Sequence, residues 1–89
     1  MSELIRYHHT HIRTPEGVTY IPRTVAAKTA NGHWEAWLEF HPVGGTAPVL
    51  RTERETSQAN HGAVEVWASG LDAVYLEGAF ARAHVVAGR

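Results

Sequence analysis

The sequence predicts an α+β fold: a four-stranded antiparallel β-meander followed by two C-terminal helices packed on one face. Three observations predict it. Residues 33–42 alternate strictly between an apolar side and a mostly polar side, the period-two pattern of a half-buried strand. The Asn31-Gly32 pair just before them is a strong signal for a tight hairpin turn. From Ala63 onward, apolar residues recur at the three- and four-residue spacing of helices.

Residues 4–13 and 18–29 are the first two expected strands, and a turn joins them. In that turn Pro15 pre-sets the backbone angle, and Gly17 can take positive φ. Pro22 interrupts the second strand, because proline cannot donate a hydrogen bond to a ladder. This strand is therefore expected either to lie at a sheet edge or to face a bulge.

The third strand, residues 33–42, can be aligned with the second through the hairpin turn. If Asn31 and Gly32 alone form the loop, Val25 lies opposite Leu38, and opposite residues share a face of the sheet. A slip of one residue would reverse every face assignment in the second strand. This register is the one that we expect.

Residues 49–52 are a short fourth strand, after which the pattern becomes helical. Gly70 is placed where the first helix should end, and Asp72 can cap a second helix. A strand at residues 74–76 is the competing interpretation of that second helix. Three side chains could cap the start of the first helix: Thr56, Ser57 and Asn60.

The composition bounds the function. The chain has 89 residues, which predicts a single domain, and it lacks cysteine, which excludes disulfides and thiolate chemistry. Eight Lys and Arg balance nine Asp and Glu, whereas domains devoted to nucleic acid usually carry a basic excess. The first residues lack the pattern of a signal peptide, and no apolar run approaches the ~18 residues of a membrane span. We expect a cytoplasmic protein without a membrane partner or a cofactor.

Seven histidines are the unusual feature of the composition. His9 and His11 alternate along the first strand and, in the expected register, share the core side with Arg23. Two histidines so spaced can hold a metal ion if a third ligand joins them. No His-Glu-x-x-His motif is present, so we assign no metal site. A small-ligand or metal-binding site, or an enzyme, using these three residues is the alternative function.

Trp37 is the large aromatic on the mostly polar side of the third strand. Two helices cover only one side of a four-stranded sheet, so the other side would expose Trp37, with Tyr20 beside it in the expected register. Exposed aromatic clusters usually mark contact surfaces. The sequence therefore predicts a homo-oligomer or a protein partner at this face.

Arg51 and Arg54 could bind phosphate, but Glu53 and Glu55 alternate with them. A solvated, internally paired stretch is the preferred interpretation. A nucleic-acid-binding module that uses Arg51 together with Trp37 ranks third among the functions.

The favoured function is a non-enzymatic cytoplasmic interaction module that self-associates. No catalytic residue is assigned: Ser57, His61 and Glu65 can share a helix face, but no nucleophile and base are defined by that spacing. Residues 54–60 and 74–79 resemble segments of a family of small uncharacterised bacterial proteins, a similarity that covers roughly residues 32–83. This resemblance implies no activity and no site.

Overall fold

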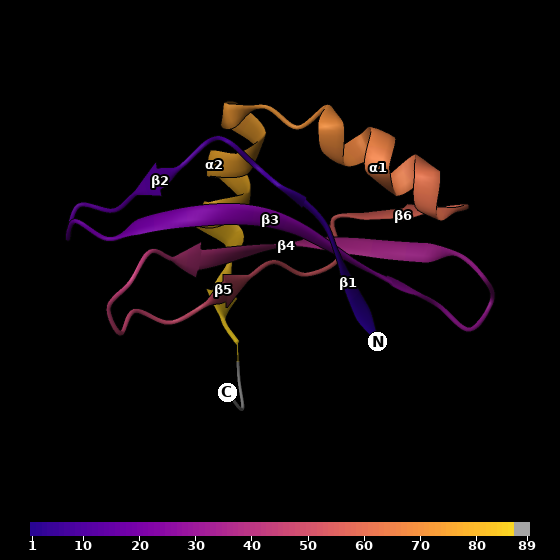
Figure 1. The fold of residues 1–89 in the computed structure, drawn as a ribbon, viewed down its shortest axis with the longest axis horizontal. Helices are drawn as coiled ribbons and strands as arrows, with labels where there is room; N and C mark the ends of the chain where they lie inside the picture. The colour runs from indigo at the N-terminus through magenta and orange to yellow at the C-terminus, as the bar shows by residue number, and fades with distance from the viewer. Residues whose placement is uncertain (87–89) are drawn as a thin grey trace.

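The computed structural model describes residues 1–86 and confirms the α+β class (Figure 1). These residues form seven strands and two helices. In chain order they are β1 (Ser2–Tyr7), β2 (Ile12–Arg13), β3 (Thr19–Lys28), β4 (Trp34–Pro42), β5 (Leu50–Arg51), β6 (Thr56–Gln58), α1 (His61–Ser69), α2 (Ala73–Arg82) and β7 (His84–Val85).

All the strands belong to one antiparallel sheet whose long central members are β3 and β4. β1 and β2 pair in succession with the outer side of β3, and β6 and β5 pair in succession with β4. β7 adds beyond β5. The expected count of four strands is therefore wrong, because the first expected strand is broken into β1 and β2, and both β6 and β7 lie outside the expected strands. The meander order itself is confirmed.

Pro22 explains the break between β1 and β2. His8 donates its backbone N–H to the carbonyl oxygen of Pro22 (N···O 2.9 Å), but proline has no N–H to donate in return. Residues 9–11 then leave the ladder, and pairing resumes with Ile12 opposite Tyr20. β3 is thus central, and of the two expected arrangements for Pro22 the bulge is the one observed.

Both helices begin and end close to where the sequence predicts. Asn60 caps α1 by accepting a hydrogen bond from the Ala63 backbone N–H (2.8 Å), and Gly70 follows its last turn. Asp72 caps α2 in the same way through Tyr75 (2.9 Å), so the competing strand at residues 74–76 is wrong. The other two candidate caps, Thr56 and Ser57, lie in β6. Neither described helix is long and apolar enough to cross a membrane.

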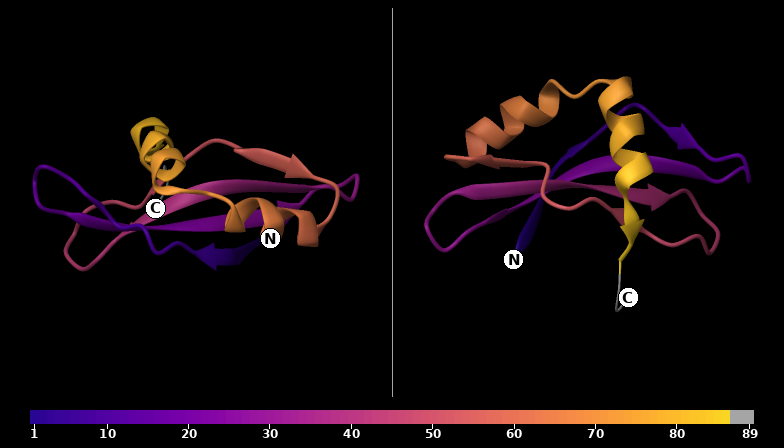
Figure 2. Two further views of the ribbon diagram at one scale, coloured as in Figure 1. Left: turned by 90° about the horizontal axis from the view of Figure 1, so that it is seen from above. Right: turned by 180° about the vertical axis from the view of Figure 1, so that it is seen from behind.

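The sheet twists so strongly that β3 and β4 cross in the view of Figure 1. α2 lies behind one half of the sheet in that view, whereas α1 lies beside β6 at the other half, as the turned views of Figure 2 show. Both helices nevertheless contact the even-numbered side chains of β3 and β4. Two helices on one face were predicted and are confirmed. We call the other face, which carries the odd-numbered side chains of β3 and β4, the open face.

Two apolar clusters form the core between the sheet and the helices. Under α2, Leu76 and Ala79 bury Leu38, Phe40 and Tyr20. Under α1, Val64 packs on two alanines of the central strands, with larger side chains at its margin: Ala26, Ala36, Ile5, Trp34 and Trp67. The apolar side of β4 is therefore the core side, as its alternation predicts.

The expected register between β3 and β4 is wrong by one residue. Thr29 donates its backbone N–H to His33 (N···O 2.7 Å), and Gly32 donates to Thr29 (3.0 Å), so the loop has three residues rather than two. Gly32 takes φ 87°, which a glycine adopts without strain. Thr24, not Val25, consequently lies opposite Leu38. A shift of one residue in the register places every side chain of β3 on the face opposite to the one expected.

Candidate functional site

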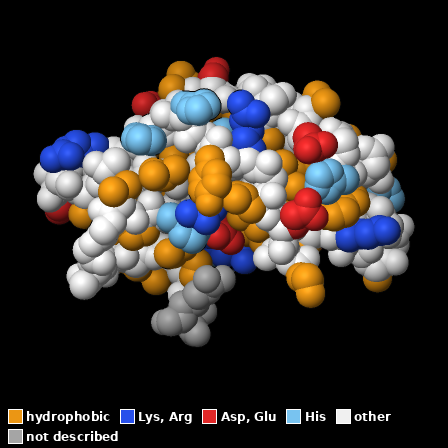
Figure 3. All heavy atoms as spheres, viewed as in Figure 1, with side chains coloured by type: hydrophobic (Ala, Val, Ile, Leu, Met, Phe, Trp, Pro, Cys, Tyr) orange, Lys and Arg blue, Asp and Glu red, His pale blue; other side chains and the backbone are white. Residues whose placement is uncertain are grey.

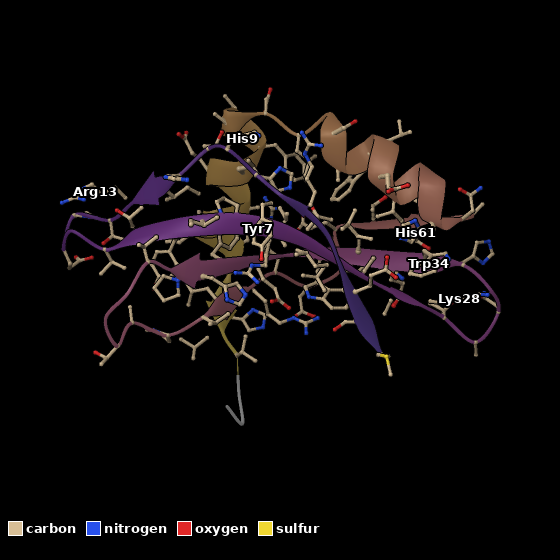
Figure 4. All side chains as sticks on the ribbon, viewed as in Figure 1. Tyr7, His9, Arg13, Lys28, Trp34 and His61 are labelled. Carbon is tan, nitrogen blue, oxygen red and sulfur yellow. The ribbon has the colours of Figure 1, made fainter. Side chains whose placement is uncertain are left out.

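The candidate site is a group of polar and aromatic side chains on the open face. Its members come from β1, β3, β4 and β5, and we call them the open-face cluster: Tyr7, Arg23, Trp37, Glu39, His41 and Arg51. Figure 3 shows basic, acidic and histidine side chains gathered among hydrophobic ones near the middle of the molecule. In Figure 4, Tyr7 lies in front of the central strands.

Four members of this cluster form one row across the sheet. Tyr7 lies opposite Arg23, Arg23 opposite Glu39, and Glu39 opposite Arg51. Directly opposed residues in neighbouring strands point to the same face. One carboxylate thus lies between two guanidinium groups, and an aromatic ring lies at one end.

Trp37 is held between two partners. Its indole Nε1–H donates to Glu39 Oε2 (3.0 Å), which fixes the ring over the β4 backbone. The guanidinium carbon of Arg51 lies 4.4 Å from the centroid of a Trp37 ring, in cation–π contact. Trp37 is consequently half-buried although no helix covers it.

Glu39 is the central anion. Its Oε1 lies 2.9 Å from Nε2 of His41, and its side chain is 12% exposed. Burial alone would raise the pKa of Glu39. The hydrogen bonds from His41 and Trp37, together with the nearby charge of Arg51, outweigh burial and hold the pKa below its usual range. Glu39 is therefore ionised at neutral pH.

Arg23 has fewer polar contacts than Glu39. Its guanidinium carbon lies 4.9 Å from the centroid of the Tyr7 ring. Its Nε is buried and has no hydrogen-bond partner among the described residues. An unmet buried donor costs about 1–3 kcal/mol, so this atom lowers the stability of the folded chain.

Arg23 and Tyr20 both lie on the face opposite to the one expected. Tyr20 is 5% exposed and belongs to the core under α2, where its hydroxyl donates to the Pro48 carbonyl oxygen (3.1 Å). Arg23 points to the open face, because its strand partners there are Tyr7 and Glu39. Both errors have one cause, the one-residue change in the β3–β4 register.

His9 and His11 do not join Arg23. Both are exposed and lie outside the strands, in the segment that leaves the ladder opposite Pro22. Figure 4 shows His9 at the rim of the molecule, well away from Tyr7. The expected cluster of these two histidines with Arg23 is therefore wrong. Within residues 1–86, no group of three or more His, Cys, Asp or Glu side chains is placed to hold a metal ion.

His8, the neighbouring histidine, was not singled out by the sequence pattern. It is 6% exposed, and its Nε2 lies 2.7 Å from the hydroxyl oxygen of Thr24. Burial, followed by the charges of Arg6 and His9, lowers the pKa of His8 below that of a free histidine. The folded protein thus prefers His8 to be neutral.

We expect this burial to make the protein less stable in mild acid. As the pH falls below about 6.5, the unfolded chain binds a proton at His8 before the folded chain does, so the free energy of unfolding decreases until the lower folded pKa is passed. Urea unfolding at pH 7 and at pH 5.5 measures this slope, and His8→Gln should flatten it. An unchanged slope in His8→Gln would contradict the assignment.

A groove lies at one end of the sheet, between the β2–β3 turn and the β4–β5 loop. It encloses about 480 Å³ and is lined by Gly17, Val18, Thr19, Val43, Gly44, Gly45, Thr46 and Ala47. None of these side chains titrates or can act as an acid or base. The groove therefore offers no catalytic chemistry, and the open-face cluster remains the candidate site.

Part of this cluster could have been found in the sequence. Glu39 and His41 alternate with Trp37 along one strand, which places all three on one face. Tyr7 could not be placed, because the pairing of β1 with β3 shifts between Leu4 and Arg6.

No protein-family model, no curated protein and no solved structure matches the chain.

Proposed function

We propose that this protein is a non-enzymatic interaction module that self-associates through the open face of its sheet. The observation that carries the proposal is the arrangement of Trp37 and Tyr7, each stacked with an arginine, on the face that the helices leave uncovered. Aromatic residues and arginine are the types most enriched at the centres of protein interfaces.

The apolar neighbours of the cluster support the same function. Leu4, Val25 and Trp37 form a second row beside the first, in which Val25 is already buried at 6% exposure. Leu4 is 42% exposed and Tyr7 is 56% exposed, values that favour burial by a partner. The cysteine-free composition favours a cytoplasmic setting.

The first test is a charge at the centre of the face. Trp37→Glu should convert a dimer into a monomer, because it replaces the largest aromatic of the surface with a charge that would be buried in the interface. Sedimentation equilibrium between about 10 and 200 μM measures the change. Val66→Glu is the matched control: Val66 is 73% exposed on α1, away from the open face, so this variant should associate as the unaltered protein does. A protein that stays monomeric at 200 μM, or a dimer that Trp37→Glu leaves intact, would contradict the proposal.

The second candidate function is binding of single-stranded nucleic acid. The stacked pair of Trp37 and Arg51 on an open sheet face favours it, because aromatic rings stack with bases and arginine contacts phosphate. The net charge of −1 and the central carboxylate of Glu39 oppose it. Binding to a fluorescent oligonucleotide that weakens steeply between 50 and 200 mM salt, and that is lost in Arg51→Ala, would establish this second function instead.

A further inference from the structure

We infer that the open face pairs with the same face of a second copy in one register, with the twofold axis running between β3 and β4. The inference rests on the proposed self-association and adds the geometry of the contact. It follows from the order of side chains in the row, which reads aromatic, cation, anion and cation: Tyr7, Arg23, Glu39 and Arg51.

This order is self-complementary. A twofold axis parallel to the strands, midway between β3 and β4, places Arg23 against the partner's Glu39 and Glu39 against the partner's Arg23. One strand farther out, it places Tyr7 against the partner's Arg51 and Arg51 against the partner's Tyr7. In such an isologous contact every pairing occurs twice. The row therefore gives two ion pairs and two cation–π contacts.

Other registers are less favourable. An axis through Glu39 would place two carboxylates against each other and Arg23 against the partner's Arg51. An axis between β4 and β5 would pair Glu39 with the partner's Arg51, but it would place Arg23 against the partner's His84, which lies next in the row beyond Arg51, and would leave Tyr7 without a partner. Opposed like charges disfavour the axis through Glu39 strongly, and the axis between β4 and β5 forgoes both cation–π contacts of Tyr7.

The apolar row supports the same axis. Val25 and Trp37 are direct neighbours in β3 and β4, so the axis sets Trp37 over the partner's Val25 position; Val25 itself is 6% exposed, and Trp37 provides most of the apolar contact. Packed sheets lie about 10 Å apart, and their strands turn by about 30° relative to each other. This turn moves residues far from the axis out of alignment with their partners, whereas residues close to the axis stay aligned. Val25, Trp37, Arg23 and Glu39 all lie next to it. Trp37 supplies apolar contact area, and the ion pairs fix the register.

The hydrogen bonds within one chain leave room for these contacts. Among the described residues no ion pair joins Arg23 to Glu39 of its own chain, and the Arg23 side chain is only partly buried, although its Nε atom is inaccessible. Glu39 accepts one hydrogen bond at Oε2 from Trp37 and one contact at Oε1 from His41. A carboxylate has about four lone-pair sites, so each oxygen of Glu39 can still accept from the partner's Arg23.

The test mixes two charge-reversed variants. In Arg23→Glu alone, each copy would present a carboxylate at position 23 to the partner's Glu39, and in Glu39→Arg alone two cationic groups would oppose each other. Each variant should therefore dimerise at least about 100-fold more weakly than the unaltered protein. When the two are mixed, both contacts become cation against anion, so a heterodimer should form with an affinity near that of the original dimer. Native mass spectrometry and sedimentation of the equimolar mixture measure it, because the two chains differ in mass.

A heterodimer cannot arise from repair of a contact within one chain, since neither variant carries both changes. If circular dichroism shows that Glu39→Arg does not fold, Arg51→Glu is mixed with Tyr7→Arg, which reverses the outer pairing on the same principle at an exposed tyrosine. Single variants that still dimerise, or a mixture that stays monomeric, would overturn the register. The proposed function would still stand if Trp37→Glu makes the unaltered dimer monomeric. An unaltered protein that is monomeric would overturn both.

Discussion

Phe40→Ala is expected to lower the free energy of unfolding by about 3–5 kcal/mol, because a fully buried aromatic ring is removed and leaves a cavity. The Phe40 ring meets the Phe80 ring of α2 edge to face, with centroids 5.2 Å apart, so the change also weakens the contact between the helix and the sheet. Urea denaturation followed by far-UV circular dichroism measures the loss. A decrease in the melting temperature of more than 10 °C should accompany it.

Trp37→Ala is the matched control for Phe40→Ala. It also removes a large aromatic ring from β4, but from the open face, where the ring is only half-buried. We expect it to destabilise the monomer by about 1 kcal/mol. The comparison belongs at a low protein concentration, since the dimerisation that we propose would add to apparent stability. Equal losses in the two variants would show that the two faces of β4 are assigned the wrong way round.

Glu55→Ala is expected to have the second largest effect, a loss of about 2–3 kcal/mol. The Glu55 side chain is 8% exposed and accepts hydrogen bonds from the Tyr75 hydroxyl and from Arg82 Nη2 (2.6 Å). Burial and the Glu55 carboxylate raise the pKa of Tyr75 to about 12, so its hydroxyl remains a donor at neutral pH. Removing the carboxylate leaves both donors of α2 without their acceptor.

Glu53→Ala provides the control for Glu55→Ala, because the Glu53 side chain is 90% exposed two residues away. Its effect should stay within about 0.5 kcal/mol. The double variant Glu55→Ala with Tyr75→Phe should be less destabilised than the sum of its single changes, since both remove the same hydrogen bond. Strict additivity in urea denaturation would mean that the contact does not hold α2 to the sheet.

The sequence was sufficient for features that depend on local chemistry. The alternation along β4 correctly assigned Leu38 and Phe40 to the core, Asp72 correctly marked the start of α2, and Asn60 was one of three candidates for the start of α1. These features depend on residues within a few positions of one another. They could be predicted without knowledge of the partner segments.

The register of β3 could not be settled in this way. An Asn-Gly pair fits a two-residue loop and also a three-residue loop with glycine at its last position, and the two differ by one residue. Long-range contacts favour the second. Tyr20 reaches the core only in this register, where its ring packs 5.3 Å from that of Phe80 and its hydroxyl finds Pro48. The candidate site includes Arg23, which lies on the open face only in this register. The residues of the site could therefore not be predicted until the length of the β3–β4 loop was known.

The broken outer strands have a consequence for how copies of this chain can meet. Long, regular edge strands invite neighbouring molecules to extend a sheet without limit. Here one edge is formed by β1, which carries Glu3 and Arg6 and an irregularity between Leu4 and Arg6, and by the two residues of β2. The other edge is formed by β6 and β7, of three and two residues. Neither edge is a good template for a growing fibre, so the self-association that we propose would use the face of the sheet, where a twofold contact closes on itself and stops at two chains.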